Sequence, residues 1–410
     1  MCAIYSFNLL CTQIYTINTY CVNMENPEEE KKEFVPNIFD LTENYLSKRY
    51  DFRYNEIALE IECKSKKEIQ YKSFNESSLY IELQKRGIKI SINNLLAILR
   101  SGYVNDYNPI KDFFLSLSPW DGQNHIQKLA SYVSIYDKNQ FEYHFLKWCV
   151  RTVKCVFKDD YFNKQAFVLV HKGQSSGKST FCRFMCPPAL ANYIAEDLSN
   201  DKDARILLAK NFLINLDELA VLSKKEINQL KSYFSKTSIN ERLPYDRKNS
   251  ILPRVCSFIG STNMATFLND ETGSVRWLCF ELTSPINFAY KTEIDINKVW
   301  AQAYALANSD FDCELSFKDV QENEKRNSKY TTLSVEHEVI SKYLKIPEND
   351  TNNQFMTSSD IMHHLSVKYQ RLNHISIGKA MISLGFERIK DKERQVYGYM
   401  VTSLPLYDSN

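Results

Sequence analysis

The chain has 410 residues, of which 44% are hydrophobic and 25% charged, and its formal net charge is +1. This length exceeds one compact core and predicts two or three domains. The charge balance excludes a polycation, so any nucleic-acid surface must be a local cluster of Lys and Arg. The eleven cysteines include no Cys-x-x-Cys pair, and no run of 18 apolar residues predicts a membrane span. We therefore expect a cytoplasmic protein with reduced thiols and no membrane partner.

Shifts in composition along the chain predict six segments. Residues 1–23 are apolar and aromatic and contain no Lys or Arg, unlike a signal peptide, whereas Met24 opens an ordinary polar N-terminus. We therefore expect residues 1–23 to be a start-site extension. The other five segments are a lead-in region, a helical block, an α/β core, a helix followed by a linker, and a small C-terminal domain, expected at 24–108, 109–164, 165–318, 319–353 and 354–410.

The α/β core is predicted by an alternation of apolar β runs with helical segments, which is typical of a parallel sheet with crossover helices. Its expected strands are Ala166–Val170, Phe212–Leu216, Val255–Ile259 and Arg276–Leu282. In the helical block that precedes the core, Trp120 and Trp148 are spaced like core anchors.

A loop of small residues follows the first expected strand and leads into a helix, in the run FVLVHKGQSSGKSTF from Phe167 to Phe181. Successive N–H groups in such a loop, together with the positive end of the helix, form an anion site. Lys178 can reach the β- and γ-phosphates of ATP, and the Ser179 hydroxyl can hold Mg²⁺. The first glycine position of the G-x-x-x-x-G-K-[ST] pattern holds Lys172, so we expect a slightly different turn. The expected nucleotide-binding residues are Gly173, Gln174, Ser175, Ser176, Gly177, Lys178, Ser179 and Thr180.

Two further strands end in residues that suit phosphate chemistry. The strand at 212–216 ends in Asp217 and Glu218; we expect Asp217 to fix Mg²⁺ through its water shell and Glu218 to polarise the attacking water. The strand that begins at Val255 leads to Asn263, whose amide can hydrogen-bond the γ-phosphate. Each feature alone is common in turns. Their order after the loop favours a motor-type hydrolase over a small-molecule kinase.

An arginine follows these strands by one turn. Arg276 stands at the start of the next expected strand. An Arg in this place can neutralise charge on the transferring phosphoryl group, either in its own subunit or across a ring interface. A plain surface ion pair is the alternative interpretation.

With these elements in order, the sequence resembles the virulence-associated protein E (VirE) family of P-loop ATPases, which is related to superfamily 3 helicases. The likeness covers about residues 45–300. The family pattern has two arginines after Thr-Gly, whereas Val275 replaces the first one here, so only Arg276 is carried over. The matching stretches are Asn108–Lys111 with Trp120–Gly122, Arg242–Arg247, Pro253–Arg254, Ile259–Asn263 and Asp270–Trp277.

The resemblance implies an AAA+-like P-loop NTPase core that uses ATP and Mg²⁺ in the replication of a prophage or mobile element. It implies DNA as a partner, single-stranded or forked, and a homo-oligomeric ring, which we expect to be a hexamer. The sequence shows no primase module, so priming is assigned to a separate protein.

Superfamily 3 motors carry a hairpin between the acidic strand and the polar strand tip, and it projects into the ring channel. The corresponding segment here is 240–254. Arg242, Arg247 and Lys248 offer phosphate contacts, and Tyr245 offers a stacking face. A solvated loop with a structural Tyr is the alternative.

The small C-terminal domain shows two helical patterns followed by a two-stranded ribbon over residues 354–405, which is typical of a winged helix. Lys379 lies on the candidate recognition helix, and Lys390, Lys392 and Arg394 lie in the candidate wing. Such modules also dock proteins, so DNA binding and protein docking both remain open.

Three functions fit these features. The leading hypothesis is an ATP-dependent DNA helicase or translocase. The first rival is an ATP-dependent DNA-binding switch or loader without unwinding activity, and the second is a P-loop enzyme that phosphorylates a small substrate. A motor requires DNA-stimulated turnover and oligomers, a switch requires only ATP-dependent DNA binding, and a kinase requires neither.

Overall fold

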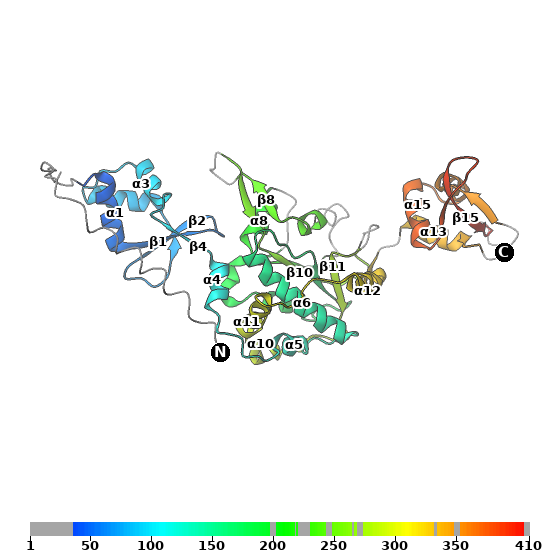
Figure 1. Cartoon of the computed structure of the whole chain (residues 1–410), viewed down its shortest axis with the longest axis horizontal. Coiled ribbons are helices and arrows are strands. Elements are labelled where there is room, and N and C mark those ends of the chain that lie inside the picture. The colour runs from blue at the N-terminus through cyan, green and yellow to red at the C-terminus, as the bar shows by residue number, and fades with distance from the viewer. Residues whose placement is uncertain are drawn as a thin grey trace, which may run out of the picture. The chain divides into compact units, whose positions relative to one another are not determined.

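The computed structural model describes residues 36–405 apart from 197–201, 218, 220–229, 243–247, 265, 269–273, 332–333 and 348–352. The expected start-site extension lies outside the described residues. One compact unit contains the described residues up to Arg53 and Ile61–Asn105, and a second contains Tyr54–Glu60 and the residues from Asp106 onward (Figure 1). Within the described part of the chain, no helix is long and apolar enough to cross a bilayer.

The lead-in region is a small α/β structure with a sheet of strand order β3-β2-β1-β4. In α2, Leu79 and Leu83 are buried, and in α3, Leu95 and Leu99 are buried. Each pair is four residues apart and therefore lines one face of its helix. The elements are α1 (Ile38–Arg49), β1 (Tyr50–Asn55), β2 (Glu60–Ser65), β3 (Lys72–Ser73), α2 (Glu76–Lys85), α3 (Ile92–Leu99) and β4 (Asn105–Tyr107).

The core sheet has five parallel strands in the order β11-β5-β10-β7-β6. The four strands expected from the sequence are present, which confirms the α/β core. The fifth, β6, has only three residues, all partly exposed, so it gives no apolar run that would predict it. The strands are β5 (Ala166–Val170), β6 (Ile194–Glu196), β7 (Leu213–Leu216), β10 (Ser257–Thr262) and β11 (Trp277–Glu281).

Both faces of the core sheet are buried, which explains why its strands are continuously apolar. Along β5, Phe167 and Leu169 belong to one hydrophobic cluster, whereas Val168 and Val170 belong to another on the opposite face. The helical elements of the core are α4 (Pro109–Ser116), α5 (His125–Ala130), α6 (Lys138–Phe157), α7 (Lys178–Phe184), α8 (Lys202–Lys210), α10 (Tyr290–Glu293), α11 (Ile296–Ala307), α12 (Phe317–Asn327) and the 3₁₀ segments η1 (Pro188–Tyr193) and η3 (Ser328–Tyr330).

The two tryptophans of the helical block have different roles. Trp148 on α6 is fully buried and packs against Phe145 and Phe167, as expected of a core anchor. Trp120 is only partly buried, and its indole N–H donates to the Gln123 carbonyl at 2.6 Å. The expectation of a core role for Trp120 is therefore wrong, because the residue lies in a surface loop.

The C-terminal module has its own hydrophobic core and the element order helix, strand, strand, helix, helix, strand, strand. Two helices, α12 and α13, lie in 319–353, where the sequence predicts one helix and a linker. Val339, Ile340 and Tyr343 of α13 are buried in the module core, so α13 is part of the module. The elements are α13 (Val335–Tyr343), β12 (Leu344–Lys345), β13 (Asn353–Met356), α14 (Ser358–Ser366), α15 (His374–Ser383), β14 (Arg388–Lys390) and β15 (Tyr397–Ser403), with β15 pairing to each of the other three strands.

Candidate nucleotide site

The loop between β5 and α7 has a backbone that only certain residues adopt easily. Gly177 precedes the helix with a φ of +86°, in the left-handed region that favours glycine. A Cβ at this position would also lie 2.8 Å from Cζ of Phe288. A side chain at Gly177 would therefore both strain the backbone and clash with the Phe288 ring. Ser175 also has a positive φ, of 57°.

The departure from the glycine pattern at Lys172 has a local explanation. Lys172 is exposed, and the chain turns at Gly173, whose N–H donates to Nδ1 of His171 at 3.1 Å. A Cβ at Gly173 would lie 2.8 Å from Cε1 of the same ring. The close approach of the His171 ring thus makes glycine the fitting residue one position later than in the standard pattern.

Lys178 lies inside the loop, and only 6% of the residue is exposed. Its ammonium donates to Oγ of Ser176 and Oδ1 of Asn263, both at 2.8 Å, and to the carbonyls of His171 and Gly173 at 3.3 and 3.4 Å. Burial lowers the pKa of Lys178, and the nearby Asp217 carboxylate opposes that shift. The loop thus surrounds the ammonium with oxygen acceptors.

Asp217 follows the carboxyl end of β7 and joins two neighbouring elements through one oxygen. Its Oδ1 accepts from Oγ of Ser179 on α7 at 2.7 Å and from Oγ of Ser261 on β10 at 2.5 Å. The two hydroxyl oxygens are 3.2 Å apart. A carboxylate and two hydroxyls therefore converge at one point. Ser261 was not singled out from the sequence, although this serine stands within the matching stretch Ile259–Asn263.

A second group of polar side chains surrounds the other oxygen of Asp217. Arg183, four residues after Ser179 on α7, donates from Nη2 to Oδ2 of Asp217 at 3.4 Å. The same guanidinium donates to Oε1 and Oε2 of Glu196, at 2.7 and 2.9 Å. Asn215 of β7 donates to Oε2 of Glu196 at 2.9 Å. The i,i+4 spacing of Ser179 and Arg183 is the one sequence signal that indicates a shared helix face.

The remaining predicted nucleotide-site residues lie as follows. Gln174 and Ser175 are exposed, whereas Thr180 is partly buried on the first turn of α7. Asn263 follows β10 directly, and its Oδ1 accepts from the Lys178 ammonium. Glu218 lies outside the described residues. Of the candidates in the described chain, Lys178, Ser179, Asp217 and Asn263 are brought together.

Arg276 lies at the opposite edge of the core sheet. It precedes β11, whose first residue, Trp277, pairs with Ala166, the first residue of β5. The phosphate loop follows the last residue of β5, Val170, so roughly 13 Å of strand separates the two edges. Nε of Arg276 donates to Oγ of Ser235 at 3.3 Å.

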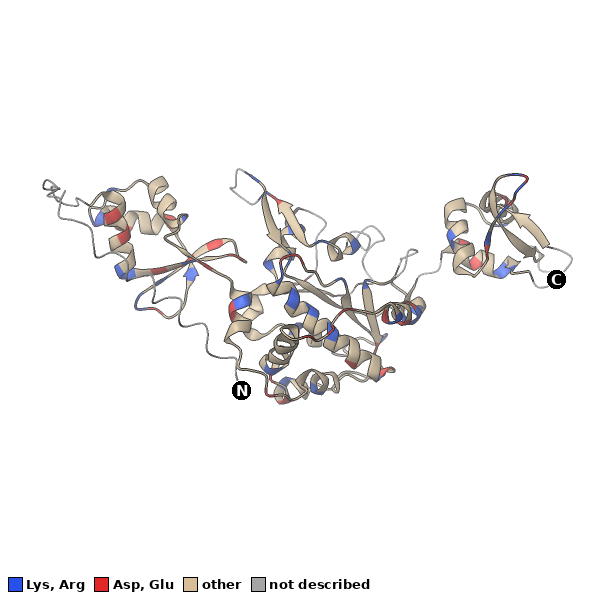
Figure 2. Cartoon of the chain, in the orientation of Figure 1, with Lys and Arg blue, Asp and Glu red and all other residues tan. Residues whose placement is uncertain are grey.

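The predicted DNA-binding segment forms an antiparallel hairpin of β8 (Ser238–Glu241) and β9 (Ser250–Pro253). Arg242 and Lys248 lie at the distal ends of its strands, whereas Tyr245 and Arg247 lie outside the described residues. Glu241 of the hairpin forms an ion pair with Arg205 of α8, with Nε and Oε1 2.5 Å apart. Basic and acidic residues are interspersed over the elements of the core (Figure 2).

The hairpin is followed by a buried arginine, Arg254, which the sequence indicates only as part of the matching stretch Pro253–Arg254. Arg254 is fully buried, and its guanidinium donates to main-chain carbonyl oxygens on both sides of the hairpin base. The acceptors are the carbonyls of Asn163, Tyr233, Phe234, Lys236 and Cys256, at 2.8 to 3.4 Å. This residue has a structural role at the hairpin base.

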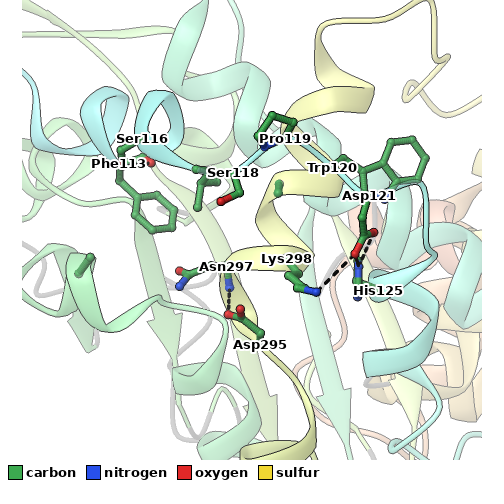
Figure 3. A pocket seen from close by; sticks show the side chains of 13 residues that line it. Phe113, Ser116, Ser118, Pro119, Trp120, Asp121, His125, Asp295, Asn297 and Lys298 are labelled. Carbon is green, nitrogen blue, oxygen red and sulfur yellow. Dashed lines mark hydrogen bonds and ion pairs between the residues drawn. The ribbon is translucent and has the colours of Figure 1, made fainter.

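A pocket of about 550 Å³ lies near the loop that carries Trp120 (Figure 3). In it, the Asp121 carboxylate accepts from Nε2 of His125 at 2.8 Å and from the ammonium of Lys298 at 3.4 Å. A backbone N–H bond from Gln123, followed by the His125 contact, lowers the pKa of Asp121. Asp121, His125 and Lys298 thus satisfy one another, and the Asp295 carboxylate accepts from the N–H of Asn297.

The parallel sheet, the loop between β5 and α7, and the polar groups at the strand tips define an α/β protein with a core of the P-loop type. A family model of the virulence-associated protein E-like domain matches residues 115–332, which is more than half of the chain. The chain therefore belongs to the virulence-associated protein E-like domain family, and the resemblance seen in its motifs is confirmed. A search of curated proteins returns no match.

Two similar solved structures have titles that name their proteins. The first is the apo structure of the NrS-1 C-terminal region, which is 13% identical; the match covers 88% of this chain and 98% of that chain, with a TM-score of 0.48. The second is titled SCCmec type IV Cch, active helicase, and is 10% identical; the match covers 86% and 92% of the two chains, with a TM-score of 0.41. Because both TM-scores lie below 0.5, the family assignment depends on the family model alone.

Proposed function

We propose that the chain is an ATP-dependent DNA helicase or translocase that serves the replication of a prophage or mobile element. The observation that carries the proposal is the convergence of Lys178, Asp217 and Asn263 at the carboxyl edge of one parallel sheet. Ligands of open α/β sheets bind at this edge. Membership of the virulence-associated protein E-like family supports the replication context.

The residues present fit ATP and Mg²⁺. The Lys178 ammonium is surrounded by oxygen atoms in the loop, and phosphate oxygens are acceptors of the same kind. Gly177 adopts a left-handed backbone before α7 that a side chain would strain. The Ser179 hydroxyl and the Asp217 carboxylate are hard oxygen donors of the type that Mg²⁺ prefers. When bound, Mg²⁺ would neutralise charge on the phosphates.

Each residue then has a task that follows from its position. Lys178 holds the β- and γ-phosphates, and Asn263, which meets its ammonium at 2.8 Å, orients both the lysine and the γ-phosphate. Ser179 and Asp217 hold the metal. Glu218, the next residue after Asp217, acts as the general base that polarises the attacking water.

The proposed assembly is a homo-oligomeric ring, a hexamer, in which Arg276 acts on the nucleotide of the neighbouring subunit. Its place at the amino edge of the sheet supports this role, because the nucleotide of its own subunit would lie at the carboxyl edge. The hairpin with Arg242, Tyr245, Arg247 and Lys248 would contact DNA in the channel. A separate protein would supply the primers.

The C-terminal module is proposed to be a winged helix. The element order α13, β12, β13, α14, α15, β14, β15 supports this assignment, with α15 as the recognition helix and the β14–β15 connection as the wing. Lys390, at the end of β14, and Lys392 and Arg394 of this connection are exposed. The module would bind DNA or dock a partner protein.

The test is strand displacement on a forked DNA substrate by the full chain with ATP and Mg²⁺. We expect displacement that requires hydrolysis and is lost in Lys178→Ala. DNA-stimulated ATPase activity without displacement would favour translocation alone. ATP-dependent DNA binding without stimulated turnover would favour the switch or loader, and phosphate transfer to a small acceptor would identify a kinase.

A further inference from the structure

An ion pair lies beside the metal ligands of the proposed site and has no part in the proposed chemistry so far. Arg183 stands on α7 and Glu196 ends β6, the edge strand next to β7. The Arg183 side chain is 51% exposed and that of Glu196 is 39% exposed. Neither is placed to fill the core, so packing does not explain why the two side chains meet.

The Arg183 guanidinium contacts two carboxylates, and its bonds to them are unequal. It makes two short bonds to Glu196, at 2.7 and 2.9 Å, but one long contact of 3.4 Å to Asp217. Two parallel N–H···O bonds to one carboxylate are the preferred and stronger arrangement for arginine. Asn215 donates to the same carboxylate at 2.9 Å and helps to fix its orientation. Glu196 is therefore the main partner of Arg183, and Asp217 is the lesser one.

We propose that Glu196 is a positioning residue that holds Arg183 away from Asp217 and thereby sets the affinity of the site for Mg²⁺. The inference rests on the proposed nucleotide function. A guanidinium and a divalent cation compete for the same carboxylate, since each favours its charged form. Glu196 occupies the fork of Arg183, so Arg183 makes only a long contact to Oδ2 of Asp217, while Oδ1 accepts from the hydroxyls of Ser179 and Ser261.

The proposal predicts that the effect of neutralising Glu196 on Mg²⁺ binding depends on whether Arg183 is present. A simple charge effect would not produce this dependence. If Glu196 only added negative charge near the metal, its neutralisation would weaken Mg²⁺ binding equally with or without Arg183. If Glu196 restrains Arg183, its neutralisation matters only while Arg183 is present to move onto Asp217. A double-mutant cycle separates the two cases.

The experiment measures binding of a fluorescent ADP analogue to the full chain as a function of Mg²⁺ concentration. The variants are Glu196→Gln, Arg183→Ala and the double variant. We expect Glu196→Gln to raise the Mg²⁺ concentration at half-maximal effect about tenfold, the scale of one additional charge-assisted contact. Arg183→Ala should have a midpoint at or below that of the wild type, and the double variant should match Arg183→Ala. Thermal unfolding of each variant checks that it is folded.

An equal rise in the midpoint for Glu196→Gln with and without Arg183 would overturn the proposal, as would no rise at all. Arg183→Lys offers a second measurement, because lysine keeps the charge but loses the fork that Glu196 holds. It should raise the midpoint, opposite in sign to Arg183→Ala. If the wild type and all the variants, Lys178→Ala included, fail to bind the ADP analogue, the proposed nucleotide function itself is wrong. Nucleotide binding with unmoved midpoints would count only against the role of Glu196.

Discussion

The two edges of the core sheet differ in how their polar residues are held. At the carboxyl edge, Lys178 is tied to Asn263, and Asp217 to Ser179 and Ser261, by bonds of 2.5 to 2.8 Å. At the amino edge, Arg276 is partly exposed and bonds to Ser235 at 3.3 Å. The carboxyl edge is a connected site within one chain, whereas the amino edge presents an arginine away from that site.

The difference follows from the direction of the parallel strands. Parallel strands place all their carboxyl ends at one edge, so residues that follow them meet without a partner. A residue that precedes a strand is at the other edge and cannot join them. In the proposed function, Arg276 would therefore act on the nucleotide of a second copy of the chain.

The largest expected effect breaks the carboxyl edge. Lys178→Ala should abolish nucleotide binding, because the loop loses its buried cation. Lys172→Ala is the matched control, since this lysine lies in the same loop but is exposed, and it should bind nucleotide like the wild type. Binding is measured by titration of a fluorescent nucleotide with Mg²⁺. Wild-type affinity in Lys178→Ala would remove this edge from the nucleotide site.

Glu218→Gln should separate binding from chemistry at the same edge. The variant should bind ATP but hydrolyse it at least ~10²-fold more slowly, the scale of a lost general base. Steady-state phosphate release measures the rate, and nucleotide titration measures the binding. Normal turnover would show that Glu218 has no part in catalysis.

Mixed rings sharpen the comparison of the edges directly. Arg276→Ala alone should bind nucleotide but hydrolyse ATP slowly. Mixing it in equal amounts with Lys178→Ala subunits should restore up to about a quarter of wild-type turnover, because about one interface in four combines an intact loop with an intact arginine. The measurement is ATPase activity of mixtures whose mixed composition is verified. No rescue in such rings would argue that Arg276 acts within its own chain.

The smallest expected effect concerns DNA. Arg247→Ala with Lys248→Ala should weaken binding to all sequences alike and flatten the salt dependence by roughly one to two units of slope, because each lost phosphate contact removes about 0.7 to 0.9. ATPase activity without DNA should survive. Rates are measured against DNA concentration at several salt levels.

A truncation provides the comparison for that double variant. The chain should be cut before α13, since Val339, Ile340 and Tyr343 of that helix are buried in the C-terminal module. We expect the truncated chain to keep DNA-stimulated turnover. If the truncation alone removes stimulation while the double variant behaves like wild type, the C-terminal module is the main DNA-binding element and the hairpin is not.

The sequence predicts the parts of the site that follow long apolar strands. Lys178, Asp217 and Asn263 each come directly after such a run or its loop, so their meeting could be expected from the topology of parallel strands. Glu196 could not be found in this way, because β6 has three residues and no apolar pattern. Ser261 was hidden for another reason: it lies inside its strand, two residues before the expected tip at Asn263.

The departures elsewhere have different physical causes. Trp120 is amphipathic and satisfies its N–H in a loop at the Gln123 carbonyl, so its size alone does not indicate burial. The helix α13 stands in a polar stretch, and its burial depends on contacts with residues of α14 and α15 that lie far along the chain. The sequence predicts one helix before the linker, whereas the structure has both α12 and α13 there.

The buried guanidinium of Arg254 gives the hairpin a mechanical property. It fastens the end of β9 to the helical residues 230–234 and to Asn163, which stands three residues before β5. These hydrogen bonds fix the base of the hairpin to the core of the chain. The same guanidinium thus links the base of the hairpin to the chain just before β5, the strand whose carboxyl end leads into the phosphate loop.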